Sequence, residues 1–192
     1  MLKKLREEHR YWRKTGVTAL ARRYFVMNSF DGILTTMGIL SGAYIGGIND
    51  TRLVLTMCLS AGIAIAFSGA WGAFFTEQAE RALALRKLDE TILEPDEKKA
   101  LRRAHKSASY FVAAVDGLSP LMATLIVASP FAFLDATHAY SAAFAIAAAC
   151  LFLLGVGLGR ISKENLVVSG MKMLFAGIAT VLIGFFLLGG RA

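Results

Sequence analysis

Five long apolar runs, at 24–48, 53–76, 108–134, 139–159 and 166–189, constrain this chain more than any other feature of its sequence. Each run is long enough for a helix to cross a bilayer, which takes about 20 residues. The runs do not alternate apolar and polar residues as transmembrane strands do. Hydrophobic residues make up 56% of the chain even without counting glycine, which excludes a water-soluble domain. The sequence therefore predicts an all-α, polytopic membrane protein with five transmembrane helices.

The positions of the basic residues predict how these helices are oriented. Of the 21 Lys and Arg residues, 18 fall in 1–23, 77–107 and 160–165, whereas Arg52 and Arg191 lie on the other side. Cytoplasmic loops retain Lys and Arg, so we expect a cytoplasmic N-terminus and a C-terminus outside. Topology and contact with anionic lipid headgroups explain the net charge of +7, and we expect no nucleic-acid partner. Because no cleavable leader or organelle-targeting signal is recognised, we expect a prokaryotic plasma membrane.

The segments outside the apolar runs complete the expected organisation. Residues 1–23 mix basic and apolar residues, which favours an amphipathic helix in the headgroup region. Residues 77–107 mix acids and bases as solvated helices do, and Pro95 near a helix start predicts a cytoplasmic helical hairpin. Between and after these segments we expect transmembrane helices 1 and 2 in 24–76 and helices 3 to 5 in 108–192.

An acidic residue inside the first apolar run is the main candidate for function. A charge near the bilayer centre costs about 2.5–3.5 kcal/mol, so it needs a partner or a role. Asp31 has Met27 and Asn28 one turn before it and Thr35 one turn after it on the same helix face. Carboxylate, amide and thioether ligands together suit a divalent metal such as Fe²⁺ or Mn²⁺. The alternative is a structural carboxylate that hydrogen-bonds to nearby Ser or Thr or pairs with a basic side chain.

Further carboxylates are candidates for binding a metal or a proton. Asp116 lies in the third run at a position similar to that of Asp31, and matching Asp-Gly pairs 85 residues apart favour a parallel duplication. Asp116 is therefore a second-repeat or proton-site candidate, or else a structural carboxylate. Glu77 and Glu80 could share a divalent cation where the second run ends, or lie on a solvated helix face. The cytoplasmic insert adds Asp89, Glu90, Glu94 and Glu97 as loose metal-binding candidates.

Several motifs in these runs resemble one known family. Residues 30–38 read Phe-Asp-Gly-Ile-Leu-Thr-Thr-Met-Gly, and residues 155–177 combine spaced glycines with a Ser-Gly-Met-Lys-Met-Leu stretch. Four further matching positions lie in the second run and just after it: Ser68, Gly72, Gln78 and Arg81. In order and position these motifs resemble the vacuolar iron transporter family of divalent-metal membrane proteins, over essentially residues 20–190. The family usually has Asn where this chain has Phe30.

The resemblance implies a homodimer whose first helices line a metal pathway. It also implies that Fe²⁺ or Mn²⁺ leaves the cytoplasm in exchange for protons, with Asp31 as the pore carboxylate. The metal is then a transported substrate, and we expect no covalently bound cofactor. Two departures stand out, because the family's second-helix Met falls on Gly69 and its Glu on Ala73. Glu77, one turn beyond Ala73, is a candidate replacement for the missing carboxylate.

Two functional hypotheses follow. In the first, the chain is a divalent-metal transporter that exposes Asp31 alternately to the two sides of the membrane. In the second, the missing ligands leave a non-transporting membrane scaffold or partner-binding protein, in which Asp31 and Asp116 hold helices together. Glycines recurring every four residues in the first run and every seven in the last indicate close helix packing, within the chain or across a dimer. An enzyme is the least favoured class, because no nucleophile and base occur at a plausible spacing.

Overall fold

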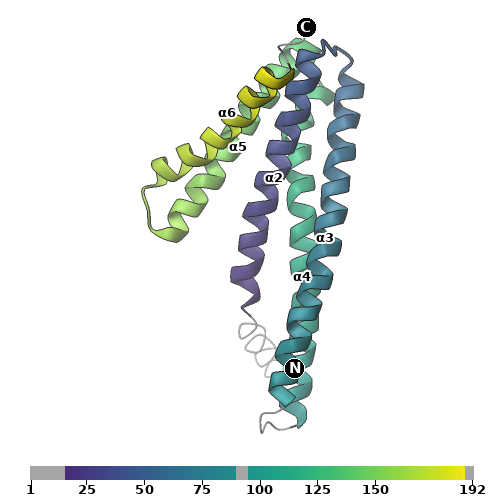
Figure 1. Cartoon of the computed structure of the whole chain (residues 1–192), viewed down its shortest axis with the longest axis vertical. Helices are drawn as coiled ribbons and strands as arrows, with labels where there is room; N and C mark the ends of the chain where they lie inside the picture. The colour runs from purple at the N-terminus through teal and green to yellow at the C-terminus, as the bar shows by residue number, and fades with distance from the viewer. Residues whose placement is uncertain (1–15, 90–94, 189–192) are drawn as a thin grey trace. The chain divides into compact units, whose positions relative to one another are not determined.

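The computed structural model describes residues 16–89 and 95–188, and every regular element in this part of the chain is helical (Figure 1). The all-α class predicted from the sequence is therefore confirmed. A short 3-10 helix, η1, follows the third of the long helices. The elements in order are α2 (Val17–Ile45), α3 (Thr51–Asp89), α4 (Pro95–Ala128), η1 (Ser129–Ala132), α5 (Ala136–Ser162) and α6 (Leu166–Leu188).

Four segments in the described residues are long and apolar enough to cross a membrane. They are Thr51–Ala84, Glu97–Ala132, Ala136–Ser162 and Leu166–Leu187. The fifth long helix, α2, has 29 residues and so extends for about 43 Å. The chain is a polytopic all-α membrane protein.

The helices α3 and α4 extend well beyond the apolar runs that predict them. α3 continues to Asp89 and α4 begins at Pro95, so most of the charged insert consists of the ends of these two helices. The predicted helix start at Pro95 is confirmed, and proline is tolerated there because the first turn needs no backbone N–H. The amphipathic helix expected over 1–23 lies outside the described residues as far as residue 15, and 17–23 form the first turns of α2.

The chain divides into two compact units, through both of which α2, α3 and α4 run. Unit 1 comprises Met1–Met27 and Ala66–Leu118, and unit 2 comprises Asn28–Ile65 and Ser119–Ala192. In unit 1, the first turns of α2 pack against α4 through buried apolar side chains: Val17, Ala108 and Val112, with Leu20 and Tyr24 against them.

The core of unit 2 is built from α2, α3, α4 and α5. The buried face of α2 contributes Ile33, Met37 and Leu40, and small residues of α5 such as Ala143 and Ala147 let the helices approach closely. Polar groups inside this core are paired. Thr36 of α2 donates a hydrogen bond to the Gly32 carbonyl at 2.7 Å and lies 3.2 Å from the hydroxyl of Thr124 of α4.

The helices α5 and α6 form a tight hairpin within unit 2 (Figure 1). Asp135 caps the start of α5, and Lys163 ends it in a left-handed conformation with φ of 59°. Gly155 packs directly against the α6 backbone, because a Cβ built there would meet the Ser169 carbonyl oxygen and lie 2.7 Å from the Cα of Gly170. Glycine at this position therefore sets how closely the two helices approach.

Candidate functional site

Helix α2 places the four predicted ligands of its apolar run along one stripe. Met27, Asn28 and Thr35 each lie three or four residues from Asp31, so the four side chains share one face of the helix. Met27 is 55% exposed and Asp31 is exposed, whereas Asn28 and Thr35 are half-buried. The stripe continues at Gly38, where an added Cβ would meet nothing within 4 Å.

The stripe points away from the core of the chain. The opposite face of α2 is the one that buries Ile33, Met37 and Leu40. An ionised carboxylate exposed to lipid costs about 2.5–3.5 kcal/mol, so a partner for Asp31 is required if this part of α2 lies in the bilayer. The geometry therefore leaves Asp31 available to a cation or to a second protein surface.

Asp116 has different surroundings from Asp31, although the sequence presents the two as equivalents. It lies in α4 within unit 1 and is only 4% exposed. A Cβ built on Gly69 of α3 would lie 2.8 Å from the Asp116 carboxylate oxygen Oδ2. The missing side chain at Gly69 therefore provides the space that the carboxylate occupies. Asp116 is also engaged by neighbouring groups.

Glu77 and Glu80, predicted to share a cation, also differ in environment. The carboxylate of Glu77 lies 3.0 Å from Nη2 of Arg81, and the two side chains are only 9% and 8% exposed respectively. Glu80 is exposed on α3. Arg81, rather than a metal, balances the charge of Glu77 in this structure. Within the described residues, no three His, Cys, Asp or Glu side chains come together as a metal site.

Most of the candidate ligands in the charged insert lie outside the residues that the structure describes. Glu97 is half-buried in the first turn of α4. Glu90 and Glu94 lie outside the described residues, as does the side chain of Asp89. Loose metal binding by this segment stays a prediction.

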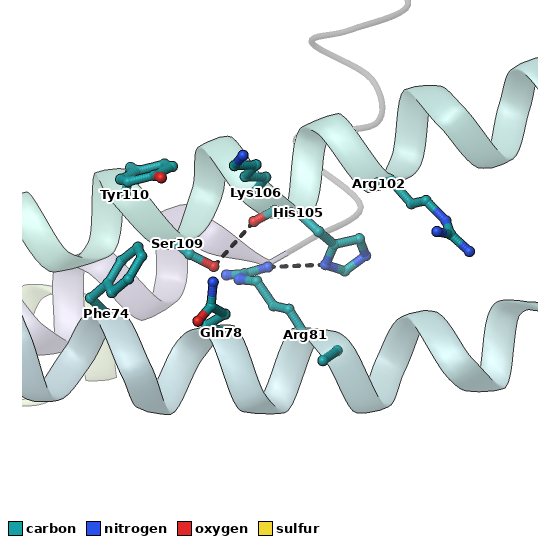
Figure 2. A pocket seen from close by; sticks show the side chains of 9 residues that line it. Phe74, Gln78, Arg81, Arg102, His105, Lys106, Ser109 and Tyr110 are labelled. Carbon is teal, nitrogen blue, oxygen red and sulfur yellow. Dashed lines mark hydrogen bonds between the residues drawn. The ribbon is translucent and has the colours of Figure 1, made fainter.

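Sequence reasoning missed one feature of unit 1, a cavity of about 330 Å³ between α3 and α4 (Figure 2). Arg81 donates from Nη1 to Nδ1 of His105 across this cavity, at 3.3 Å. The recurrence of polar side chains at helical spacing on both helices is the signal that could have indicated it. The polar side chains that line it are Gln78 and Arg81 of α3 and Arg102, His105, Lys106 and Ser109 of α4.

Fold and site together define a multi-pass α-helical membrane protein with a buried acidic side chain, Asp116, in one of its membrane helices. Residues 22–108 match the VIT family. An uncharacterized protein of Methanocaldococcus jannaschii is 30% identical over 166 residues, which cover 85% of this chain and 86% of that protein. The chain belongs to the VIT family, the transporter family that its motifs resemble. It is accordingly a member of a membrane transporter family, whose proteins are not enzymes.

Proposed function

We propose that this protein exports a divalent metal ion, Fe²⁺ or Mn²⁺, from the cytoplasm in exchange for protons, and that Asp31 binds the metal. The observation that carries the proposal is the carboxylate of Asp31 on the face of α2 that points away from the core. Carboxylate and amide oxygens suit such a metal, and the adjacent Met27 offers a thioether. We place the protein in a prokaryotic plasma membrane, in keeping with the archaeal source of its relative.

A homodimer would supply the ligands that one chain lacks. Asp31 and Asn28 of a single α2 give too few donors for a metal that prefers six oxygen ligands. Two copies of the stripe facing each other across a two-fold axis would double the set. Gly38 favours this pairing, because the open space beside it lets another helix come close.

Competition between metal and protons at the same carboxylate would couple the two fluxes. Asp31 binds a cation when ionised and releases it when protonated, so a higher proton concentration outside would drive metal release there. Two Asp31 carboxylates, one from each chain, balance the charge of one divalent ion, and two protons can replace it. Alternate exposure of this site to the two sides then moves metal out and protons in.

Asp116 is the second proton-site candidate in this proposal. It stands beside Gly69, the position at which the family's methionine is missing, and it is buried in a helix that crosses the membrane. A carboxylate there partly replaces the lost ligand chemistry on α3. Glu77 contributes less in this scheme, because its ion pair with Arg81 competes with any metal.

Uptake into proteoliposomes under an imposed pH gradient tests the proposal. The full-length protein carrying Asp31→Asn keeps the size and hydrogen bonding of the side chain but loses its charge, and we expect uptake of Fe²⁺ and Mn²⁺ to fall to that of empty liposomes. Asp50→Asn is the matched control. Asp50 is an exposed cap whose Oδ1 accepts hydrogen bonds from the N–H groups of Arg52 and Leu53, and asparagine caps equally well. Wild-type uptake by Asp31→Asn would contradict the proposal.

A non-transporting scaffold is the second candidate function. Gly69 and Ala73 stand where the family has Met and Glu, and the Ala73 side chain is buried. In that case Asp31 holds helices together across a dimer, so Asp31→Asn is harmless and Asp31→Ala loosens the dimer. No uptake of either metal by correctly folded and oriented wild-type protein would favour this function.

A further inference from the structure

The cavity in unit 1 has an aromatic end and a basic region (Figure 2). Phe74 of α3 and Tyr110 of α4 form the aromatic end, with ring centroids 5.2 Å apart. Arg102 lies at the other end, and Arg81 and Lys106 lie between. The volume of about 330 Å³ falls in the range of about 300–1,000 Å³ typical of small-ligand sites.

The charge around the cavity favours an anion. Three permanent cations, Arg81, Arg102 and Lys106, line it, and no carboxylate does so in the described part of the chain. Glu77 balances one of these charges through its pair with Arg81. Lys106 has no ion-pair partner among the described residues. Cations gathered in a partly water-excluding space attract an anion more strongly than the same cations spread over a surface.

Arg81 also has an unused hydrogen-bond donor. Its side chain is 8% exposed, and its Nε–H has no acceptor among the described residues. Its Nη1 donates to Nδ1 of His105, because arginine cannot accept, so the ring proton of a neutral His105 sits on Nε2. Buried N–H groups are normally satisfied, and a missing acceptor on a cavity-lining arginine points to a ligand that supplies one.

The cavity lies where both helices leave their apolar runs. Phe74 and Tyr110 belong to the runs at 53–76 and 108–134, whereas the cations lie beyond them. This is the side that the distribution of Lys and Arg assigns to the cytoplasm. The cations are therefore at the level of lipid headgroups, with the aromatic pair toward the membrane interior.

We propose that this cavity binds the phosphate group of an anionic ligand. The unused Nε–H of Arg81 donates to one phosphate oxygen, the planar guanidinium of Arg102 matches a pair of them, and Lys106 adds a point charge. The phosphate belongs either to a phospholipid of the cytoplasmic leaflet or to a phosphate compound dissolved in the cytoplasm. If the ligand is a phospholipid, Phe74 and Tyr110 pack against its apolar part. The site is separate from Asp31, and its test does not depend on transport.

Binding to the purified full-length protein in uncharged detergent tests the proposal in two arms. In the first, native mass spectrometry compares phosphatidylglycerol with monogalactosyl diacylglycerol, a neutral lipid without phosphate. In the second, calorimetry measures binding of inorganic phosphate and of glycerol 3-phosphate. We expect one phosphate-bearing ligand per chain and no comparable binding of the galactolipid.

A pair of matched double variants places the site. Arg102→Ala with Lys106→Ala removes two cavity cations, and Lys99→Ala with Arg103→Ala removes two cations that do not line the cavity. All four side chains are exposed on α4, so neither variant should disturb folding, and melting temperatures check this. We expect the first variant to bind at least about tenfold more weakly, as loss of charged hydrogen bonds implies. The second should stay within about twofold of wild type.

Each outcome decides the matter. Selective loss of phosphatidylglycerol binding in the Arg102→Ala, Lys106→Ala variant supports a lipid phosphate as the ligand. Selective loss of glycerol 3-phosphate or inorganic phosphate binding in that variant supports a cytoplasmic phosphate compound. Equal weakening by both double variants would show diffuse electrostatic attraction and overturn the proposal. Absence of binding in both arms, or galactolipid binding as strong as that of phosphatidylglycerol, would overturn it as well.

Discussion

The buried ion pair of Glu77 and Arg81 makes the sharpest prediction about stability. We consider Glu77→Leu, which removes the carboxylate 3.0 Å from Nη2 of Arg81 while retaining an apolar side chain of similar length. Arg81 then keeps one hydrogen-bond partner among the described residues, the ring of His105 at 3.3 Å. A guanidinium that is 8% exposed is left without its counter-charge.

The magnitude follows from burial. Removing one partner of a buried ion pair costs about 3–5 kcal/mol, and the remaining hydrogen bond to His105 places this case at about 3 kcal/mol. Replacing both partners, by Glu77→Leu with Arg81→Met, removes the charge together with its need for a partner. The double variant should cost about 1 kcal/mol or less, because apolar pairs of similar volume often replace buried ion pairs without loss.

The assay is the free energy of unfolding of the full-length protein in mixed micelles, measured for wild type, both single variants and the double variant. Glu80→Leu is the matched control, since Glu80 is an exposed carboxylate on the same helix, and we expect a change within about 0.5 kcal/mol. The reasoning is refuted if Glu77→Leu costs no more than Glu80→Leu, or if the coupling energy between Glu77 and Arg81 is that of a surface pair, below about 1 kcal/mol.

Three further predictions concern unit 2. Gly155→Ala places a Cβ 2.7 Å from the α6 backbone and should destabilise the protein by about 1–3 kcal/mol. Gly157→Ala, whose added Cβ would meet nothing within 4 Å, should leave stability unchanged or raise it by up to about 1 kcal/mol. Equal free energies of unfolding for the two variants would contradict this. Tyr140→Phe removes a 2.8 Å hydrogen bond to a backbone carbonyl and should cost about 1 kcal/mol in the same assay, and no change would show that the bond is unimportant. A hydrogen bond with His138 holds the pKa of Asp135 below its usual value. The stability that the ionised Asp135 contributes is therefore present above the ordinary aspartate pKa and is lost as the pH falls through the lowered pKa. A ¹³C NMR titration should show that His138→Ala raises the pKa of Asp135, and an unchanged titration would contradict this.

The helices were largely predictable because membrane helices are dictated by runs of apolar residues. Their ends were less so. α3 continues past its apolar run to Asp89, through a stretch rich in alanine, leucine, glutamate and arginine that favours helix without help from lipid. The hydropathy pattern predicts where the helix leaves the membrane, whereas helix propensity and i,i+4 pairs such as Glu77 with Arg81 determine where the helix ends.

The same distinction applies to the candidate site: features set within one helix were predictable from the sequence, and features set by contacts between helices were not. The stripe of Asn28, Asp31 and Thr35 was predictable, because spacing along one helix fixes which side chains share a face. The burial of Asp116 beside Gly69 and the cavity lined by Arg81 were not, because each depends on how α4 is positioned along α3. No pattern within a single helix contains that register.

Binding of Mn²⁺ to the purified protein tests the central claim most directly. The six-line electron paramagnetic resonance spectrum of free Mn²⁺ weakens as the ion binds, so a titration at neutral pH gives both affinity and stoichiometry. We expect wild type and Asp50→Asn to bind Mn²⁺ alike and Asp31→Asn to lose the tight site. Equal binding by Asp31→Asn and wild type would contradict the assignment of Asp31 as the metal ligand.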